Sequence, residues 1–293
     1  MLTKNITYAF FGTGPLAESV LASLVKNNCI PKLVVTKPDT FQGRHMHLTA
    51  PHIKTWSELK GIKVLQPKVL NADVYDELVA LGTFDVFVVA SYGKIIPETI
   101  LGIPTYGTLN VHPSLLPLYR GPSPIEQTLL DGNMTTGVTI IKLDREMDHG
   151  PILAQNAFII PPEITAGTLE VMCGQVGGEL LTQVLDAYID GTLIPKEQEH
   201  ARATFCKKIT KDIGEVTLDT EGEIVRRKFR ALTPWPSVYF FVNHSGKTIR
   251  VKITDVDLVT PLPSSSKATD VILAVIPEGK KEMSWEDFKR GYL

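Results

Sequence analysis

The sequence predicts an α/β fold in which a doubly wound, mainly parallel sheet is followed by a smaller β-rich domain. Apolar runs typical of buried strands, such as 6–11 and 84–90, alternate with segments of helical apolar spacing, such as 15–25. This alternation is typical of parallel sheets covered by helices. Short β-like runs separated by turn residues dominate the last third of the 293 residues, a pattern typical of a small β-barrel.

The first domain is expected to occupy residues 1–190, and Gly12-Thr13-Gly14 forms the turn between its first strand and first helix. Residues 37–53 contain Pro, Gly, Arg and three His without a clear period, so we expect a long loop there. The expected strands are 6–11, 31–36, 84–90, 107–111 and 137–143, and the expected helices are 15–25, 73–81 and 168–188.

The polar stretch after the last of these helices is expected to be a linker, residues 191–203, and residues 204–293 then form the second domain. A helix at about 223–232 precedes Pro234-Trp235-Pro236. The β-like runs of this domain are 238–242, 248–254 and 271–276, and a turn or loose loop lies between the last two.

Composition excludes several classes of protein. Hydrophobic residues make up 43% and charged residues 21%, which is enough apolar material for a core and too little charge for wholesale disorder. A net charge of −2 argues against a general nucleic-acid binder. The part from Lys196 onward has 17 Lys and Arg against 14 Asp and Glu, which is compatible with an RNA partner but does not demand one.

The cysteines also bear on where the protein works. Cys29, Cys173 and Cys206 lie far apart and show no metal or redox spacing. We find no signal peptide and no apolar stretch near the ~18 residues that span a bilayer. We therefore expect a cytoplasmic monomer with reduced thiols, without a membrane or DNA partner.

Asn110 and His112 are the strongest candidates for catalytic residues. They stand two residues apart at the end of the strand expected at 107–111, so both side chains point to the same side of it. Pro113 and Pro117 stop this strand and stiffen the loop that follows. A carboxylate follows the next strand, and we expect the three groups to meet at the carboxyl ends of neighbouring strands.

Asp148 is the expected carboxylate, because the glycine that follows His149 allows a ligand to approach closely. Asp144 competes for this role, and Glu146 is a weaker candidate. Such a set suits acyl transfer, since an amide donates to a developing oxyanion, an imidazole moves protons and a carboxylate orients the imidazole. Taken alone, the Asn and His could equally be a turn residue and a hydrogen-bonded structural histidine.

A nicotinamide-binding protein is the rival interpretation. Gly12-Thr13-Gly14-Pro15-Leu16-Ala17 matches the dinucleotide fingerprint with Ala at its third position, and Asp39 lies near the place of the ribose-binding acid. Any strand-to-helix turn of this fold favours Gly, however. Pro15 also removes a backbone donor that the diphosphate would need, so this interpretation is disfavoured.

Two further clusters have ordinary explanations. His45, His47 and His52 lack a carboxylate or Cys partner at ligand spacing, so a solvated loop is favoured and no metal is expected. The helix face formed by Arg226-Arg227-Lys228-Phe229-Arg230 is basic. Ordinary solvation and contact with phosphates are equal alternatives for it.

The run Asn110-Val111-His112-Pro113-Ser114-Leu115-Leu116-Pro117, with Tyr119-Arg120-Gly121, resembles the signature of the folate-dependent formyltransferases. Thr136-Gly137-Val138-Thr139 and Met147-Asp148-His149-Gly150 follow at that family's spacing. The likeness extends, through segments such as Arg230-Ala231-Leu232-Thr233-Pro234-Trp235-Pro236, to the members that formylate methionyl initiator tRNA. The resemblance covers nearly the whole chain.

The resemblance implies a Rossmann-like formyltransferase domain followed by an OB-like barrel. It implies 10-formyltetrahydrofolate as the formyl donor and the α-amino group of methionyl initiator tRNA as the acceptor, without a metal. Asn110, His112 and Asp148 would be catalytic. The implied folate contacts are Ser91, Tyr92, Gly93, Ser114, Leu115, Leu116, Pro117, Val138 and Asp144, and the implied tRNA contacts are Arg44, Lys207, Lys208, Arg226 and Arg230.

One departure from the family lies between Asp257 and Asp270, where the chain is shorter than the family's barrel and a strand pair is expected to be missing or reduced to a turn. It bears on the tRNA contacts and not on the catalytic residues. A formyltransferase that acts on a small amine, such as an amino sugar nucleotide or a purine precursor, shares the site and is the alternative. A non-catalytic Rossmann-like protein is disfavoured by the complete set of Asn, His and Asp.

Overall fold

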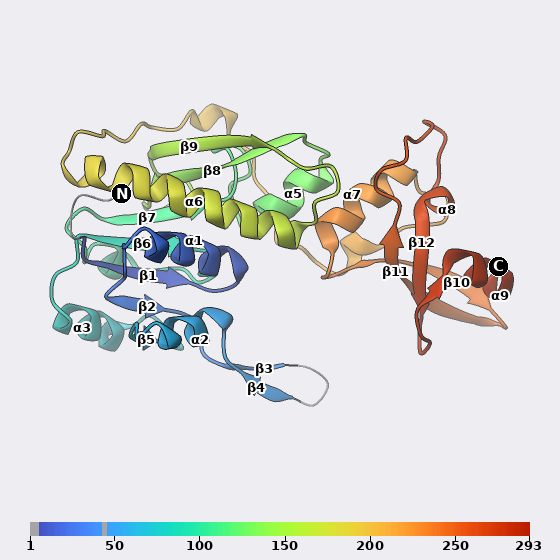
Figure 1. The fold of residues 1–293 in the computed structure, drawn as a ribbon, viewed down its shortest axis with the longest axis horizontal. Coiled ribbons are helices and arrows are strands. Elements are labelled where there is room, and N and C mark those ends of the chain that lie inside the picture. Colours follow the sequence, from blue (N-terminus) through green and yellow to red (C-terminus); the bar gives the residue numbers. More distant parts are fainter. Residues whose placement is uncertain (1–5, 43–45) are drawn as a thin grey trace. The chain divides into compact units, whose positions relative to one another are not determined.

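The computed structural model describes residues 6–42 and 46–293, which form two compact units (Figure 1). The first unit holds residues up to 122, 136–158 and 170–205, and the second holds 123–135, 159–169 and 206–293. The segment 191–203, expected to be a linker, therefore packs within the first unit. Two short segments that precede residue 190 pack within the second.

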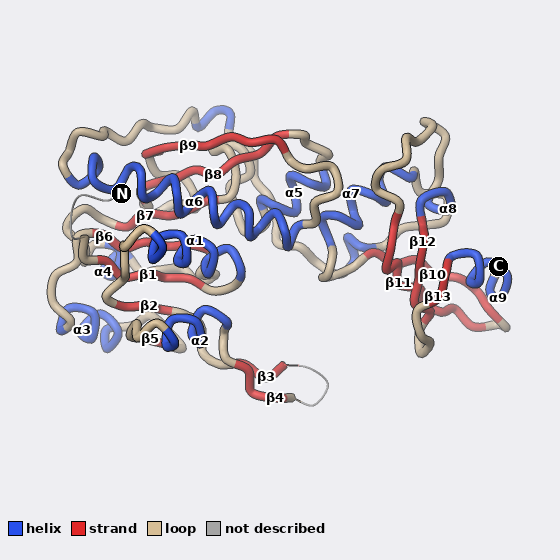
Figure 2. Tube along the Cα trace, in the orientation of Figure 1, coloured by secondary structure: helices blue, strands red, loops and turns tan. Residues whose placement is uncertain are grey.

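A seven-stranded sheet organises the first unit, in the order β5-β2-β1-β6-β7-β8-β9 (Figure 2). The pairs from β5 to β7 are all parallel, which confirms the expected mainly parallel, doubly wound sheet. The strands are β1 (Tyr8–Gly12), β2 (Leu33–Val35), β5 (Val64–Leu65), β6 (Val86–Ala90), β7 (Thr108–His112), β8 (Thr135–Lys142) and β9 (Ile152–Ile159).

The direction of β8 corrects one expectation. It runs antiparallel to β7, with Thr139 opposite His112 and Lys142 opposite Leu109. Its carboxyl end therefore lies beside the beginning of β7, and the expected meeting of carboxyl ends at this pair is wrong. The apolar pattern of a strand does not indicate whether the strand runs parallel or antiparallel to its neighbour. That direction depends on how the chain connects the two strands.

Helices cover both faces of this sheet. Phe11, Phe87 and Tyr92 belong to a buried cluster with residues of α3 (Ala72–Ala80) and α4 (Glu98–Leu101). The other face is covered by α1 (Pro15–Lys26) and α6 (Ala166–Ile189), which lie side by side (Figure 1). They approach closely because Gly174 and Gly178 of α6 face the backbone of α1, where a Cβ atom would stand 2.7–2.8 Å from its carbonyl oxygens.

Residues 37–53 are more regular than the long loop expected there. The strands β3 (Thr40–Gln42) and β4 (His47–Thr49) pair as a hairpin, and α2 (His52–Leu59) follows Pro51. The strands have only three residues each and β4 is exposed, so they show no apolar alternation by which the sequence could reveal them.

The second unit contains a four-stranded antiparallel sheet in the order β10-β11-β12-β13, with Phe240, Trp285 and Phe288 in aromatic contact. Between β11 and β12 the structure has a loop and one four-residue helix, α8. The elements are α5 (Pro124–Leu130), α7 (Gly222–Leu232), β10 (Val238–His244), β11 (Lys247–Val256), α8 (Ala268–Val271), β12 (Ile272–Pro277), β13 (Met283–Ser284) and α9 (Trp285–Tyr292). No helix within the described ranges is both long and apolar enough to cross a membrane.

Candidate active site

The strand β7 presents Asn110 and His112 on one face and buries Val111 on the other. Val111 packs against α6 at Gly177, where an added Cβ atom would lie 2.4 Å from the Val111 side chain. Since side chains alternate along a strand, this burial fixes which way Asn110 and His112 point. They share their face with Val89 of the parallel neighbour β6, which is paired with Asn110.

His112 is held by a backbone carbonyl. Its Nε2 atom lies 2.9 Å from the carbonyl oxygen of Tyr119, and its side chain is 5% exposed. A carbonyl only accepts hydrogen bonds, so this contact places a proton on Nε2. Nδ1 is then the ring atom that can accept and return a proton, and it lies 3.5 Å from Oδ1 of Asp148.

Asp148 reaches this face from the loop after β8. The backbone N–H of Gly121 donates to its Oδ2 atom at 2.8 Å, which leaves Oδ1 facing the strand. Oδ1 lies 3.5 Å from both Nδ2 of Asn110 and Nδ1 of His112. One anchored carboxylate therefore faces both residues that the sequence singles out.

The competing carboxylates lie elsewhere. Asp144 pairs with His149, whose Nδ1 is 2.7 Å from its Oδ2. Glu146 is exposed, and its backbone N–H donates to Asp144. Of the three candidates, the structure brings Asp148 to His112.

The expected folate contacts fall into exposed and buried groups. Ser91 and Gly93 follow β6 directly, beside β7 in the sheet, and Val138 precedes Thr139, the residue opposite His112. Ser91, Gly93 and Asp144 are exposed, Leu115 and Pro117 are half-buried, and Tyr92, Ser114, Leu116 and Val138 are buried.

Tyr92, one of the expected folate contacts, is buried inside the first unit. Its ring meets Phe11 edge-on with centroids 5.6 Å apart, and burial raises its pKa to about 12. Its buried hydroxyl has no hydrogen-bond partner among the residues that the structure describes. The phenol is therefore neutral at physiological pH and belongs to the core in this structure.

The loop after β7 is tied to β8. Thr139 donates through its hydroxyl to the Ser114 carbonyl at 2.6 Å and accepts from the Leu116 N–H at 3.1 Å. The Ser114 hydroxyl donates to the Leu118 carbonyl at 2.6 Å. These bonds hold the predicted folate-binding loop in one shape beside His112.

A side chain of the protein lies where a dinucleotide's diphosphate would bind, beside the turn Gly12-Thr13-Gly14. Oε1 of Glu170 accepts from the Leu16 N–H at 3.3 Å, at the helix N-terminus where a dinucleotide's diphosphate would bind. Asp39, the possible ribose ligand, accepts from Gln66 and Lys54, and these hydrogen bonds lower its pKa. Both features argue further against the dinucleotide interpretation.

The predicted tRNA contacts differ in accessibility. Lys207 and Lys208 are exposed. Arg226 is buried, and donates to the carbonyls of Asp257 and Thr260. Arg44 lies outside the described residues.

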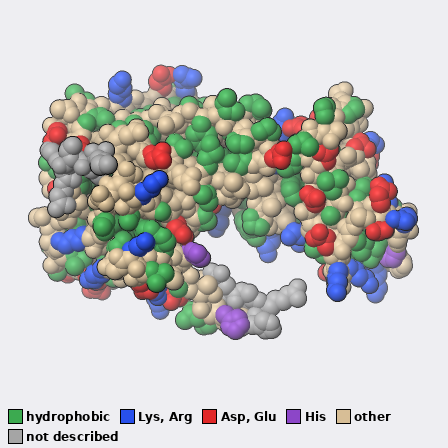
Figure 3. All heavy atoms as spheres, in the orientation of Figure 1, with side chains coloured by type: hydrophobic (Ala, Val, Ile, Leu, Met, Phe, Trp, Pro, Cys, Tyr) green, Lys and Arg blue, Asp and Glu red, His purple; other side chains and the backbone are tan. Residues whose placement is uncertain are grey.

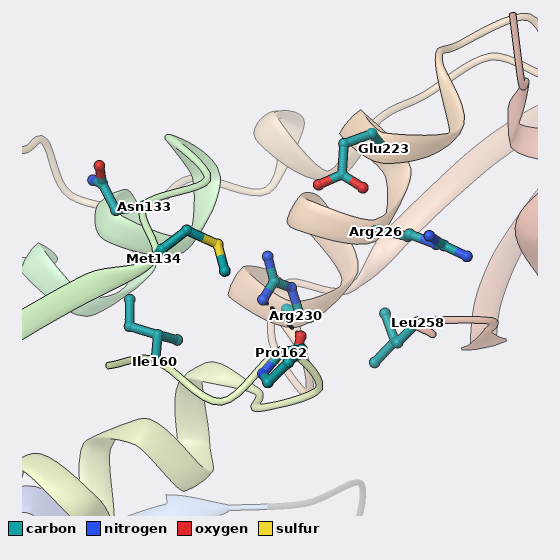
Figure 4. Close-up of a pocket in the computed structure, with 8 residues that line it drawn as sticks. All are labelled: Asn133, Met134, Ile160, Pro162, Glu223, Arg226, Arg230 and Leu258. Atoms are coloured by element: carbon teal, nitrogen blue, oxygen red, sulfur yellow. Dashed lines mark hydrogen bonds between the residues drawn. The ribbon is translucent and has the colours of Figure 1, made fainter. Parts of the chain in front are cut away.

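Arg230 lies in the second unit beside a pocket of about 180 Å³ (Figure 4). Its Nη1 atom donates to the carbonyl of Pro162 at 2.8 Å, and burial lowers its pKa. Arg226 and Arg230 therefore have partners within the protein, which sequence spacing could not reveal. Among the residues that the structure describes, no group of His, Cys, Asp or Glu side chains could hold a metal ion.

Sequence reasoning assigned no role to three residues near the site: Arg120, Gln198 and Thr204. Gln198 and Arg120 are 5% and 4% exposed and bonded to each other. Arg120 belongs to the quoted signature, but Gln198 and Thr204 fall in or beside the polar stretch expected to be a linker. Polar composition alone does not distinguish a solvated segment from one with buried hydrogen bonds.

Comparison with known families matches residues 4–185 to Formyl transferase and residues 208–271 to Formyl transferase, C-terminal domain. A methionyl-tRNA formyltransferase from Chloroflexus aurantiacus is 41% identical over 242 residues, covering 83% of this chain and 77% of that protein. One from Carboxydothermus hydrogenoformans is 35% identical over 298 residues, covering 97% and 96%.

Solved structures share the fold. HypX from Aquifex aeolicus, in complex with tetrahydrofolic acid, superposes with a TM-score of 0.66 at 14% identity, covering 97% of this chain, which spans about half (47%) of that protein. A 4-N formyltransferase from Francisella tularensis superposes with a TM-score of 0.64 at 16% identity, covering 87% and 99%. Family matches over both parts of the sequence, close relatives along its length and this shared architecture agree: the chain belongs to the formyl transferase family.

Proposed function

We propose that this protein transfers the formyl group of 10-formyltetrahydrofolate to the α-amino group of methionyl initiator tRNA. The observation that carries the proposal is the convergence of Asn110, His112 and Asp148 within a chain whose relatives, matched over as much as 98% of its length, are methionyl-tRNA formyltransferases. The product, N-formylmethionyl-tRNA, serves translation initiation, so we propose that the enzyme works in the cytoplasm. We also propose that it is a monomer.

The proposed chemistry follows from the three side chains. The neutral amine of the acceptor attacks the formyl carbon, and a C–N bond forms as the carbonyl oxygen becomes an oxyanion. Asn110 donates its Nδ2–H to this oxygen. His112 accepts the amine's proton at Nδ1, and Asp148 stabilises the positive charge that the imidazole gains. The tetrahedral intermediate collapses, the bond to N10 of the folate breaks, and N10 leaves with a proton returned by His112.

The folate is proposed to lie along the carboxyl ends of β6 and β7. Doubly wound sheets bind ligands outside the carboxyl ends of their strands, and Ser91 to Gly93 and residues 114–117 flank His112 there. The hydrogen bonds that Thr139 makes with Ser114 and Leu116 support the second of these segments before a ligand arrives. A site fixed in advance lowers the entropic cost of binding.

For tRNA, Lys207 and Lys208 are the accessible members of the proposed set, and phosphate contact needs an accessible cation. Arg226 and Arg230 both donate to backbone carbonyls of the protein. We therefore propose that they contribute to tRNA binding indirectly, by holding the structure of the surrounding surface. Arg44 is proposed from the resemblance alone.

The preferred acceptor distinguishes a tRNA formyltransferase from a formyltransferase that acts on a small amine. Formyl transfer from 10-formyltetrahydrofolate is measured with charged initiator tRNA, free methionine and an amino sugar nucleotide as competing acceptors. We expect the charged tRNA to have the highest kcat/KM. A higher kcat/KM for the sugar nucleotide would replace the proposal with a small-amine formyltransferase.

A further inference from the structure

Residues 198–204, the 198–204 segment, contact both loops that hold the proposed catalytic side chains. We infer that this segment is a positioning element of the active site, in which Gln198 fixes Asp148 and Thr204 fixes the carbonyl that orients His112. The inference rests on the proposed function and adds residues that no sequence motif singles out. All the contacts that carry it lie within the first compact unit.

Gln198 holds the loop of Asp148 by its backbone. Its Nε2 atom donates to the carbonyls of Asp148 at 2.9 Å and Gly150 at 2.8 Å. Its Oε1 atom accepts from Nε and Nη2 of Arg120 at 3.2 and 2.7 Å. Because carbonyls only accept and arginine only donates, the amide has one satisfactory orientation. A buried side chain is thereby locked between the two loops.

The backbone of Asp148 needs this support. Its φ is +52°, in the left-handed region that a residue with a side chain seldom adopts. Such a conformation persists where surrounding contacts determine it. The bond from Gln198 to its carbonyl and the bond from Gly121 to its carboxylate hold Asp148 at both ends.

Thr204 supports the other loop in the same way. Tyr119, whose carbonyl accepts from His112, also has a left-handed backbone, with φ +60°. Its N–H donates to Oγ1 of Thr204 at 2.8 Å, and the next N–H, that of Arg120, donates to the Thr204 carbonyl at 2.9 Å. The carbonyl that places the proton on His112 is thus aimed by the 198–204 segment.

His200 adds a third contact between the segment and the Asp148 loop. Its ring stacks on His149 with centroids 4.0 Å apart and planes 4° apart, and His149 is bonded to Asp144. Arg120 donates to Nδ1 of His200 at 2.9 Å, so that nitrogen carries no proton. Arg120 therefore joins Gln198 and His200 and sets the spacing of the two loops.

The first test replaces Gln198 by Glu, which keeps the acceptor for Arg120 and removes both donors. We expect kcat to fall at least ~10-fold, since small misplacements of catalytic groups are costly, and the Kd for the folate to change less than about 3-fold. In an Asp148→Asn background the same change should have less than about a 2-fold effect. An equal loss in both backgrounds would mean a general structural role and would overturn the inference.

Thr204 provides a second pair of variants that does not disturb the core, because this residue is exposed. Thr204→Val removes the acceptor, whereas Thr204→Ser keeps it. We expect the Val variant to lose at least ~10-fold in kcat and the Ser variant to remain within about 3-fold of wild type. Equal activities of the two would contradict the role of Oγ1.

A matched control removes a partly buried hydrogen bond away from the site. Tyr188 donates to the Tyr106 carbonyl at 2.6 Å, before the amino end of β7, and Tyr188→Phe should leave kcat within about 2-fold. If Tyr188→Phe lowered kcat as much as Gln198→Glu, the effect of Gln198→Glu would not be specific to the active site, and the inference would be overturned.

A readout without turnover separates this inference from the proposed function. The Gly121 amide donates to Asp148, so its NMR chemical shift and hydrogen exchange report the position of that carboxylate. Gln198→Glu should change the shift and speed the exchange, and Tyr188→Phe should change neither. An unchanged Gly121 amide in Gln198→Glu would refute the inference. Absence of formyl transfer by the wild-type protein would refute the proposed function alone.

Discussion

At the scale of single residues, His112 shows how a backbone carbonyl can assign the roles of the two ring nitrogens. Nε2 donates to the Tyr119 carbonyl, and Nδ1 faces the carboxylate of Asp148, which also lies 3.5 Å from the amide nitrogen of Asn110. The sequence predicts the three side chains, because their type and two-residue spacing carry the chemistry. It could not predict the carbonyl, since any residue has one.

The negative charge of Asp148 is testable separately from its shape. Asp148→Asn keeps the size of the side chain and removes the charge that stabilises a protonated imidazole. We expect kcat to fall at least ~10²-fold, on the scale of losing an acid–base group, with little change in the Kd for the folate. Steady-state kinetics and equilibrium titration measure the two quantities.

Glu146→Gln is the matched control for that change, because Glu146 is exposed and was the weaker candidate for the same role. Its kcat should stay within about 2-fold of wild type, as for most surface substitutions. If Glu146→Gln were as damaging as Asp148→Asn, the assignment of the carboxylate would be wrong.

At the scale of elements, strand and helix periodicity predicts β1, α1, β6, β7 and α6 to within a few residues. These elements are long or deeply buried, so their apolar spacing is clear. The direction of β8 and the hydrogen bonds of the 198–204 segment were missed, because strand direction and hydrogen-bond partners depend on tertiary contacts. Residue patterns along the chain do not record those contacts.

The packing of α6 on β7 gives a prediction at this scale. A Cβ atom at Gly177 would lie 2.4 Å from Val111, whereas one at Gly167 of the same helix would meet no atom of the described residues within 4 Å. Gly177→Ala should therefore lower the free energy of unfolding by about 1–3 kcal/mol through overpacking. Gly167→Ala should leave it unchanged or raise it by up to about 1 kcal/mol. Denaturant titration measures both, and equal effects would contradict the packing described.

The loop after β11 gives a prediction about pH. Hydrogen bonds from Thr260 and Val259, together with Arg226, lower the pKa of Asp257 from 3.8 to about 2. A lowered pKa in the folded state stabilises the protein above the unfolded value, and this stabilisation is lost as pH falls from about 4 to 2. Thermal melts should show a smaller loss over this range for Asp257→Asn than for wild type. If Tm fell by the same amount in both proteins over this pH range, the contribution of Asp257 to stability would be contradicted.

At the scale of the whole molecule, charge does not by itself identify the partner. On the face drawn in Figure 3, basic and acidic side chains are interspersed over the C-terminal part of the chain. The net charge is −2. Recognition of an anionic RNA would therefore depend on a few accessible cations, such as Lys207 and Lys208, and not on a general field.

Ligand-dependent stability tests the choice of donor. A ligand that binds only the folded state raises Tm by mass action. A stable analogue of the formyl folate should raise Tm with a saturable dose dependence, while NAD and NADP at the same concentrations should not. Glu170 already occupies the helix N-terminus that the diphosphate would need. A saturable shift with NAD alone would restore the dinucleotide interpretation.

Whether Asn110, His112 and Asp148 together perform formyl transfer is measured by the single-turnover rate constant of His112→Ala. The enzyme is saturated with the formyl folate and mixed with charged initiator tRNA. Saturation removes differences in folate binding from the comparison. We predict a rate constant at least ~10²-fold below that of wild type. A rate constant within a few-fold of wild type would contradict the claim.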